Sequence, residues 1–167
     1  MQKLCLLLIL LLALGCSGTT KQTEEEIATL ETKLAEQPSE EVLQQLLGLY
    51  KEMASKSKGD KHLDYLWKAG ETARAAREFD TAEAIFMDLY AQNESPDLAT
   101  KALFLHAFMC DEDLKQYDKA KMLYQRFLEK YPDSDFSDDA QFLLENLGKS
   151  DEEMLQLLNK SNKDSTN

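Results

Sequence analysis

The chain has 167 residues with 19 basic and 31 acidic side chains, which gives a formal net charge of −12. A surface this acidic repels phosphate backbones, so we expect no nucleic-acid partner. The length suits one domain that buries a hydrophobic core of its own.

The first fifteen residues are predicted to be a secretory signal peptide. Lys3 gives a positive start, the eleven residues from Leu4 to Leu14 are apolar, and small Gly15 precedes Cys16. Eleven residues are too few to cross a bilayer as a helix, which takes about 20. Residues 1–15 are therefore expected to direct export and to be cleaved between Gly15 and Cys16.

The stretch Ala13-Leu14-Gly15-Cys16 resembles the lipobox of bacterial lipoproteins, although the family more often has Leu and then a small residue before Gly-Cys. The resemblance implies that the Cys16 thiol receives a diacylglyceryl group and that the new amino terminus is acylated, for example with palmitate. Two or three acyl chains anchor a protein stably. Ordinary cleavage that leaves Cys16 as a free thiol is the alternative. By the family's sorting rules, Ser17 implies the outer membrane and a periplasmic location, with surface display left open.

Residues 16–23 are predicted to form the lipidated cysteine and a polar tether, 24–160 a helical domain, and 161–167 a disordered tail. Gly and Pro are scarce after Thr23, and no stretch shows sustained period-2 alternation. Capping patterns at Thr23…Glu26, Asp80…Glu83, Ser95-Pro96 and Ser150…Glu153 suggest helix starts. The predicted helices are 24–36, 40–55, 61–77, 80–92, 97–114, 117–131, 137–147 and 151–159.

Apolar residues recur at one interval along these helices. A spacing of 38 residues relates Leu66, Phe104 and Phe142, and also the pairs Ala69/Ala107, Ala82/Ala120, Phe86/Tyr124 and Leu89/Phe127. Leu43, Leu47 and Tyr50 precede Ala82, Phe86 and Leu89 by 39 residues. A two-helix unit cannot bury its apolar face alone, but the next unit covers it, so this period predicts a stacked array of helix hairpins.

The segments Phe79–Phe86 and Tyr117–Tyr124 resemble the second helix of a tetratricopeptide repeat, with an aromatic residue, an acidic residue, Ala and a second aromatic residue in register. Tyr131-Pro132-Asp133-Ser134 resembles the end of such a unit. The resemblance implies an all-α, antiparallel helix-hairpin solenoid of about three repeats plus C-terminal capping helices. A plain helical bundle is the alternative. Because the repeat usually takes about 34 residues, a step of 38 predicts extended turns between units.

In this family the first helices of the repeats line an inner, concave surface that binds peptides or partner helices. Carried over by position, that surface would contain Asp64, Trp67, Glu71, Arg74, Leu105, Met109 and Glu112. The Lys and Asn residues of the carboxylate-clamp type are missing. Trp67 with Leu105 and Met109 predicts an apolar groove bounded by acidic residues, or else Trp67 packs within the repeat stack.

No pattern in the sequence indicates catalysis, a metal site or a cofactor. His62 and His106 lack metal-ligand spacing, and we expect His106 to be a packing residue. Nucleophile elbows and glycine-rich phosphate loops do not occur. Cys110 is interpreted as a small buried residue, with a redox or intermolecular thiol as the alternative.

The sequence therefore favours a non-enzymatic adaptor that is held at the outer membrane by lipid and binds another envelope protein or peptide segment. The stretch from Tyr131 to Ala140 resembles those of tetratricopeptide proteins associated with Tol–Pal and with β-barrel assembly. A periplasmic chaperone or carrier that uses an apolar concave groove is the alternative. An accessory subunit of an envelope hydrolase or secretion apparatus would differ only in its partner.

Overall fold

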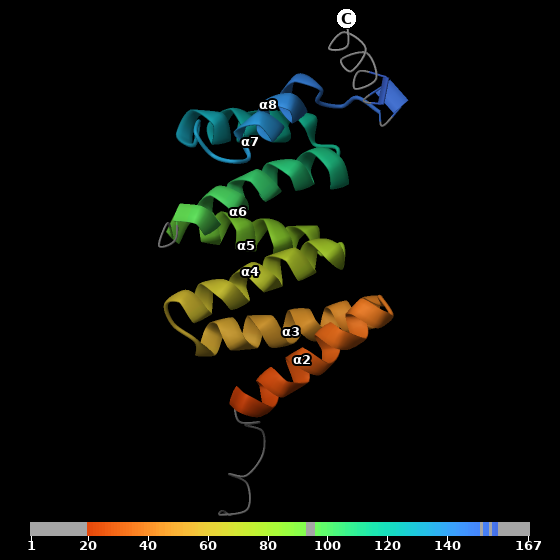
Figure 1. The fold of residues 1–167 in the computed structure, drawn as a ribbon, viewed down its shortest axis with the longest axis vertical. Helices are drawn as coiled ribbons and strands as arrows, with labels where there is room; N and C mark the ends of the chain where they lie inside the picture. The colour runs from red at the N-terminus through yellow and green to blue at the C-terminus, as the bar shows by residue number, and fades with distance from the viewer. Residues whose placement is uncertain (1–19, 93–95, 151, 154, 157–167) are drawn as a thin grey trace, which may run out of the picture.

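The computed structural model describes residues 20–92, 96–150, 152–153 and 155–156. Within them the chain forms helices in the order α2 (Thr20–Glu36), α3 (Glu40–Lys56), α4 (Asp60–Ala75), α5 (Phe79–Gln92), α6 (Pro96–Phe108), the π-helix η1 (Met109–Asp113), α7 (Tyr117–Lys130) and α8 (Ser137–Glu145). Each helix packs against its neighbours in sequence, and the helices stack along the long axis of the molecule (Figure 1). The predicted all-α, tetratricopeptide-like solenoid is confirmed.

Several predicted features lie outside the described residues. These are the signal peptide, Gly15, Cys16 and the tail at 161–167, while the helix predicted at 151–159 is described only at 152–153 and 155–156. Among the described helices, none combines the length and the apolar character that a membrane span requires.

The first described helix begins earlier than predicted. Residues 20–23, which we assigned to the tether, belong to α2, and Thr23 is buried inside that helix instead of capping it. The reason is that Thr23, Ile27 and Leu30 share one helical face that packs on the core, so an earlier start adds buried contact.

The other capping predictions have different outcomes. Helix α5 starts at Phe79, so Asp80 lies in its first turn and does not cap it. Pro96 begins α6 as predicted, whereas Ser95 is outside the described residues. Ser150 and Glu153 form a reciprocal capping box, in which the Ser150 N–H donates to Oε2 of Glu153 at 2.8 Å and the Glu153 N–H donates to Oγ of Ser150 at 3.3 Å.

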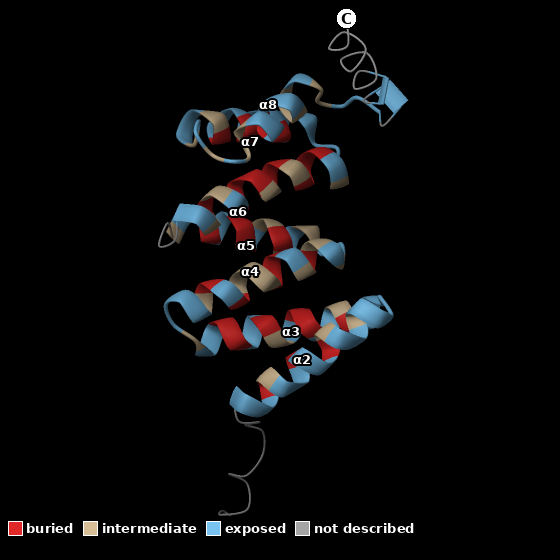
Figure 2. Cartoon of the chain, in the orientation of Figure 1, coloured by how far each residue is buried: buried red, intermediate tan, exposed pale blue. Residues whose placement is uncertain are grey.

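Four pairs of residues that repeat at 38 are buried in successive units. Buried residues recur on each helix along the stack (Figure 2). Ala82 and Ala120 are fully buried, and so are the Phe86 and Tyr124 side chains beside them. The Ala69/Ala107 and Leu89/Phe127 pairs are buried as well. Small residues let the helices approach closely, and the aromatic rings fill the space next to them.

The series Leu66, Phe104 and Phe142 follows this rule only in part. Leu66 is half-buried and Phe104 is buried, but Phe142 is 37% exposed, so its assignment as a repeat-packing residue is wrong. Helix α8 packs against α7, and Ala140 is its fully buried residue.

Polar contacts also connect residues one repeat apart. Lys61 and Lys68 of α4 bind Glu24 and Glu31 of α2, with Nζ–Oε1 distances of 2.5 and 2.9 Å. Lys119 of α7 binds Glu83 of α5 at 2.5 Å. These partners are 36 or 37 positions apart in sequence. The stack is thus joined by charged pairs at its surface as well as by its core.

The connections between two-helix units differ in length. Residues 57–59 join α3 to α4 in only three residues, so the predicted extended turn is absent there, whereas the connection 131–136 from α7 to α8 is longer, as predicted. Inside the units, residues 76–78 and 114–116 are three-residue connections. Helix α6 continues into η1, where the Leu114 N–H donates to the Met109 carbonyl at 3.0 Å, five residues back. Arg77 and Lys115, 38 residues apart, reverse the chain at positive φ angles of 61° and 53°.

Candidate functional site

A groove of about 420 Å³ lies where the end of α4, the start of α5 and the α6–η1 segment meet. The three-residue connection 76–78 places the start of α5 beside the end of α4, and the contact between Arg74 of α4 and Asp113 of η1 brings the α6–η1 segment to the same place. The groove is lined by Glu71, Arg74, Ala75, Arg77, Phe79, Leu105 and Asp113.

Arg74 is the most firmly positioned charge in this groove. Its Nε atom donates to Oδ2 of Asp113 at 2.5 Å, and its guanidinium lies 4.9 Å from the centre of the Phe108 ring. The Arg74 and Asp113 side chains are only 27% and 25% exposed. A half-buried, charge-assisted pair stacked on an aromatic ring gives the groove a fixed wall.

Glu71 and Arg77 supply a second pair of opposite charges in the groove, besides Arg74 and Asp113. Partial burial raises the pKa of the Glu71 carboxyl, while Trp67 and the charges of Lys101 and Lys68 oppose that rise. The Arg77 guanidinium lies 5.2 Å from the centre of the Phe79 ring. Two cations and two carboxylates around Leu105 and Phe79 make a surface that can bind both polar and apolar groups of a peptide.

Three of the residues predicted for the partner surface, Glu71, Arg74 and Leu105, come together in this groove. Asp64 is exposed near Lys68, and Glu112 is exposed and paired with Lys115 at 3.2 Å. Neither lines the groove.

Trp67 and Met109 pack into the protein. Trp67 is half-buried against the core, with its ring 6.1 Å from that of Phe86, as the repeat-stack alternative expects. Met109 is fully buried, so its placement on an exposed groove is wrong. It is the first residue of η1 and belongs to the hydrophobic core against which Trp67 also packs.

Sequence reasoning missed Arg77, Phe79 and Asp113 as groove residues. Phe79 was read only as the first aromatic residue of the repeat motif, and Arg77 lies in a connection. Asp113 faces Arg74 from the end of a π-helix, which no pattern in the sequence signals. The acidic run at 111–113 lies about one repeat after Arg74 in the sequence, and this spacing could have indicated an ion pair between them.

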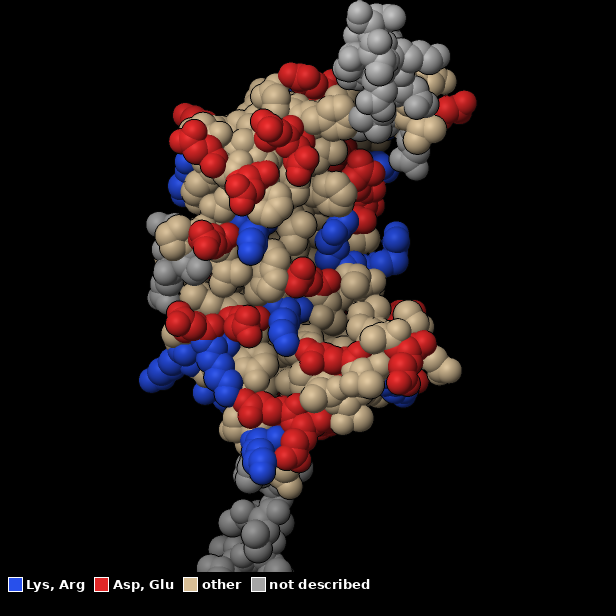
Figure 3. Space-filling model, in the orientation of Figure 1, with Lys and Arg blue, Asp and Glu red and all other residues tan. Residues whose placement is uncertain are grey.

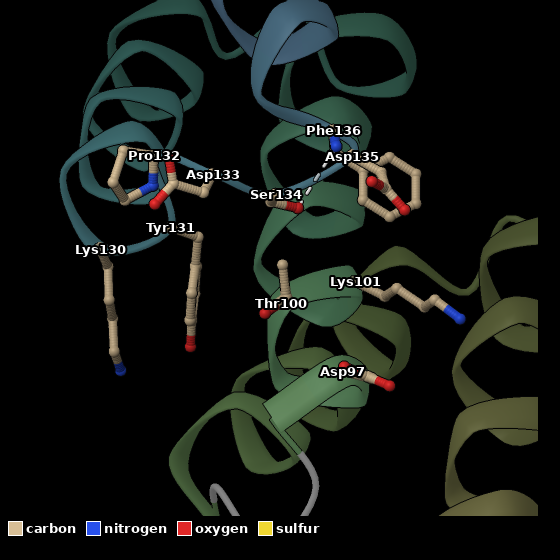
Figure 4. A pocket seen from close by; sticks show the side chains of 10 residues that line it. All are labelled: Asp97, Thr100, Lys101, Lys130, Tyr131, Pro132, Asp133, Ser134, Asp135 and Phe136. Carbon is tan, nitrogen blue, oxygen red and sulfur yellow. Dashed lines mark hydrogen bonds between the residues drawn. The ribbon is translucent and has the colours of Figure 1, made fainter.

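A second hollow of about 520 Å³ lies between α6 and the connection from α7 to α8 (Figure 4). The predicted repeat ending, Tyr131 to Ser134, forms one wall, with Thr100 and Lys101 of α6 opposite. Oγ of Ser137 donates to the Tyr131 carbonyl at 2.8 Å, and the Phe136 ring stacks on Phe104 with centres 5.0 Å apart. These contacts shape the connection, and most of the residues that line the hollow are polar or charged.

The charged side chains are unevenly spread in the view of Figure 3. Acidic residues gather at the end formed by α7 and α8, whereas Lys and Arg mix with them farther along the stack. A partner segment that crosses this face would therefore meet alternating charges over α4 and α6 and mainly negative charge beyond them.

The remaining chemistry-bearing residues are packed into the fold. His106 is buried, and Nδ1 of His62 lies 2.8 Å from the Ala54 carbonyl oxygen. Cys110 is fully buried, and burial raises its pKa to about 11, which agrees with the small-core-residue interpretation. In the described part of the chain, no group of His, Cys, Asp and Glu is arranged to hold a metal ion.

Comparison with known proteins supports one family. Residues 101–134, which run from α6 through η1 and α7, match the tetratricopeptide repeat. No curated protein and no solved structure matches the chain. A tetratricopeptide repeat indicates a module for protein–protein interaction, and proteins that contain it are generally non-enzymatic adaptors. The matched repeat and the helical stack together support a tetratricopeptide-type protein, built as an all-α helical-repeat solenoid.

Proposed function

We propose that this protein is a bacterial lipoprotein, anchored in the outer membrane through Cys16 and facing the periplasm, that binds another envelope protein as a non-enzymatic adaptor. The charged groove between α4 and α6 is the surface that receives the partner. The observation that carries the proposal is the fixed Arg74–Asp113 wall beside Glu71, Arg77 and Leu105. Pairs of opposite charge around an apolar centre favour a defined peptide segment.

The lipid anchor is supported by the order Leu14-Gly15-Cys16 after a short apolar run. Replacing Cys16 with Ala should move the protein from the membrane fraction to the soluble fraction, because the acyl chains can no longer be attached. Cys5→Ala, which changes a cysteine inside the predicted signal peptide, is the matched control and should leave the protein in the membrane. Equal membrane association of both variants would contradict the anchor.

The groove is tested by reversing its two exposed charges. The double variant Glu71→Lys with Arg77→Glu keeps the net charge but should lower capture of the partner roughly tenfold, since like charges then face the partner's groups. The double variant Lys33→Glu with Glu36→Lys makes the same exchange on exposed residues of α2. If both variants capture the partner equally well, the groove is not the binding surface.

A carrier of unfolded proteins would need a groove that accepts varied apolar cargo. Four of the seven residues that line the groove are charged, which suits a defined segment better than varied apolar cargo. Suppression of aggregation of several unrelated unfolded proteins, unaffected by the groove variant, would favour the carrier.

A further inference from the structure

A second surface, on α5 and α7, has features that the proposed adaptor role does not use. An apolar groove of about 440 Å³ runs between these helices, over a floor that includes Phe86, Leu103 and His106. Met87 of α5 and Met122 of α7 stand at its edges, 52% and 63% exposed. They are two of the five large hydrophobic side chains exposed in the described residues, and both line this groove.

The two helices carry opposite charge. Helix α5 has three acidic side chains, Asp80, Glu83 and Asp88, and no basic one. Helix α7 has four basic and two acidic side chains. Within the protein, Glu83 binds Lys119 across the groove. Arg126 of α7 is exposed and lines the groove, and Asp88 of α5 is exposed one residue beyond Met87, where it accepts a hydrogen bond from Nε2 of Gln92 at 2.8 Å.

The outer surface of α5 carries small exposed side chains, so this helix can fit into a groove on another molecule. Ala84 and Ala91 are exposed on the same side of the helix as Met87. Methionine is flexible and polarisable, and it commonly fills apolar gaps at protein interfaces. This outer surface therefore has the low profile and the apolar centre that a groove of this kind accepts.

We infer that this face binds the same face of a second copy of the chain. A two-fold arrangement places the acidic outer surface of α5 from each copy in the groove beside the basic α7 of the other, with Met87 in the apolar floor and Asp88 near Arg126. A two-fold interface requires a surface that is complementary to itself, and here both charge signs and the apolar centre are present on one face. A partner of a single charge would leave either the acidic or the basic helix unmatched.

The test uses two full-length chains with different affinity tags, expressed together and extracted in a mild detergent. The two tagged chains should co-purify. Arg126→Glu and Asp88→Arg should each lower co-purification roughly tenfold, because each places like charges opposite one another. The variant that carries both changes should recover the wild-type level, since the charges are exchanged and again opposite.

Two controls separate this interface from chance association in a micelle. Lys33→Glu on α2 changes the net charge as much as Arg126→Glu and should co-purify like the wild type, whereas Met122→Glu should not co-purify. Circular dichroism checks that each variant remains helical, as expected for exposed positions. Failure of the two wild-type chains to co-purify, or of the double variant to recover, would overturn the inference. The proposed adaptor role would be unaffected, because it rests on the other groove.

Discussion

Arg74 of α4 and Asp113 of η1 are 39 residues apart in sequence and lie in direct contact, with Nε 2.5 Å from Oδ2. They belong to successive repeats, so the pair joins one two-helix unit to the next. The same pair forms a wall of the groove between those units. Stacking of the repeats and the shape of the candidate site therefore depend on a common contact.

Loss of this contact should destabilise the protein measurably. We expect Asp113→Ala to lower the free energy of unfolding by about 1–2 kcal/mol, because Arg74 is left half-buried without its carboxylate. Glu112→Ala, which removes an exposed carboxylate from the same π-helix, should cost less than about 0.5 kcal/mol. Urea unfolding followed by circular dichroism measures both free energies, and equal losses for the two variants would show that the half-buried Arg74–Asp113 pair does not stabilise the protein more than an exposed carboxylate does.

Two glycines inside helices offer a matched comparison of packing. A Cβ on Gly70 would lie 2.9 Å from Cε1 of the fully buried Phe86 and 3.0 Å from Cγ2 of Ile85, so the α4–α5 contact would have to open. We expect Gly70→Ala to destabilise by about 1–3 kcal/mol.

Gly48 of α3 has nothing within 4 Å of an added Cβ. Gly48→Ala should therefore stabilise by about 0.5–1 kcal/mol, through the higher helix propensity of Ala. The shift in the urea midpoint should have opposite signs for the two variants. A gain in stability for Gly70→Ala would contradict the close approach of α4 and α5.

These comparisons show what the sequence could and could not predict. The 38-residue spacing identified the equivalent buried positions of Ala82 and Ala120, because each repeat solves the same packing problem in the same way. It failed at Phe142, which is 37% exposed on α8, and family position failed at Met109, which is fully buried at the start of η1. Three residues of the groove were found from family position. The placement of Arg77 and Asp113 in the groove depends on the geometry of the α4–α5 turn and of η1, which the local sequence pattern does not indicate.

The buried His106 should make stability depend on pH. Burial lowers the pKa of His106 below 6.5, the charges of Lys119 and Arg126 lower it further, and Glu83, whose Oε1 is 3.6 Å from Nε2, opposes them. The unfolded chain then binds a proton more readily than the folded one. The stabilising contribution is complete above about pH 6.5 and is lost as the pH falls through the folded pKa.

The measurement compares the wild type with His106→Gln by urea unfolding between about pH 7.5 and 5.5. As the pH falls, the free energy of unfolding of the wild type should decrease relative to that of His106→Gln. Comparing the two chains cancels Glu71 and Asp111, whose raised pKa values act in the opposite direction. Parallel curves for the two chains would refute a role for this histidine.

Cys110 should be unreactive while the protein is folded. The residue is fully buried and its pKa is raised to about 11, so at pH 8 the thiolate is a fraction on the order of one in a thousand. Iodoacetamide should label the peptide that contains Cys110 in urea but hardly at all in buffer, as read by mass spectrometry. Rapid labelling of that peptide in the folded protein would instead point to a redox or intermolecular thiol.

The central claim is that the groove between α4 and α6 receives a partner protein in the cell envelope. The most direct measurement places a photoreactive amino acid at Glu71 in the full-length chain in living cells, with Thr29 on the exposed surface of α2 as the comparison position. Ultraviolet light should join the protein to one defined envelope protein from position 71 and not from position 29, and Arg77→Glu should abolish that product. Absence of a product at position 71, or the same product from both positions, would contradict the account.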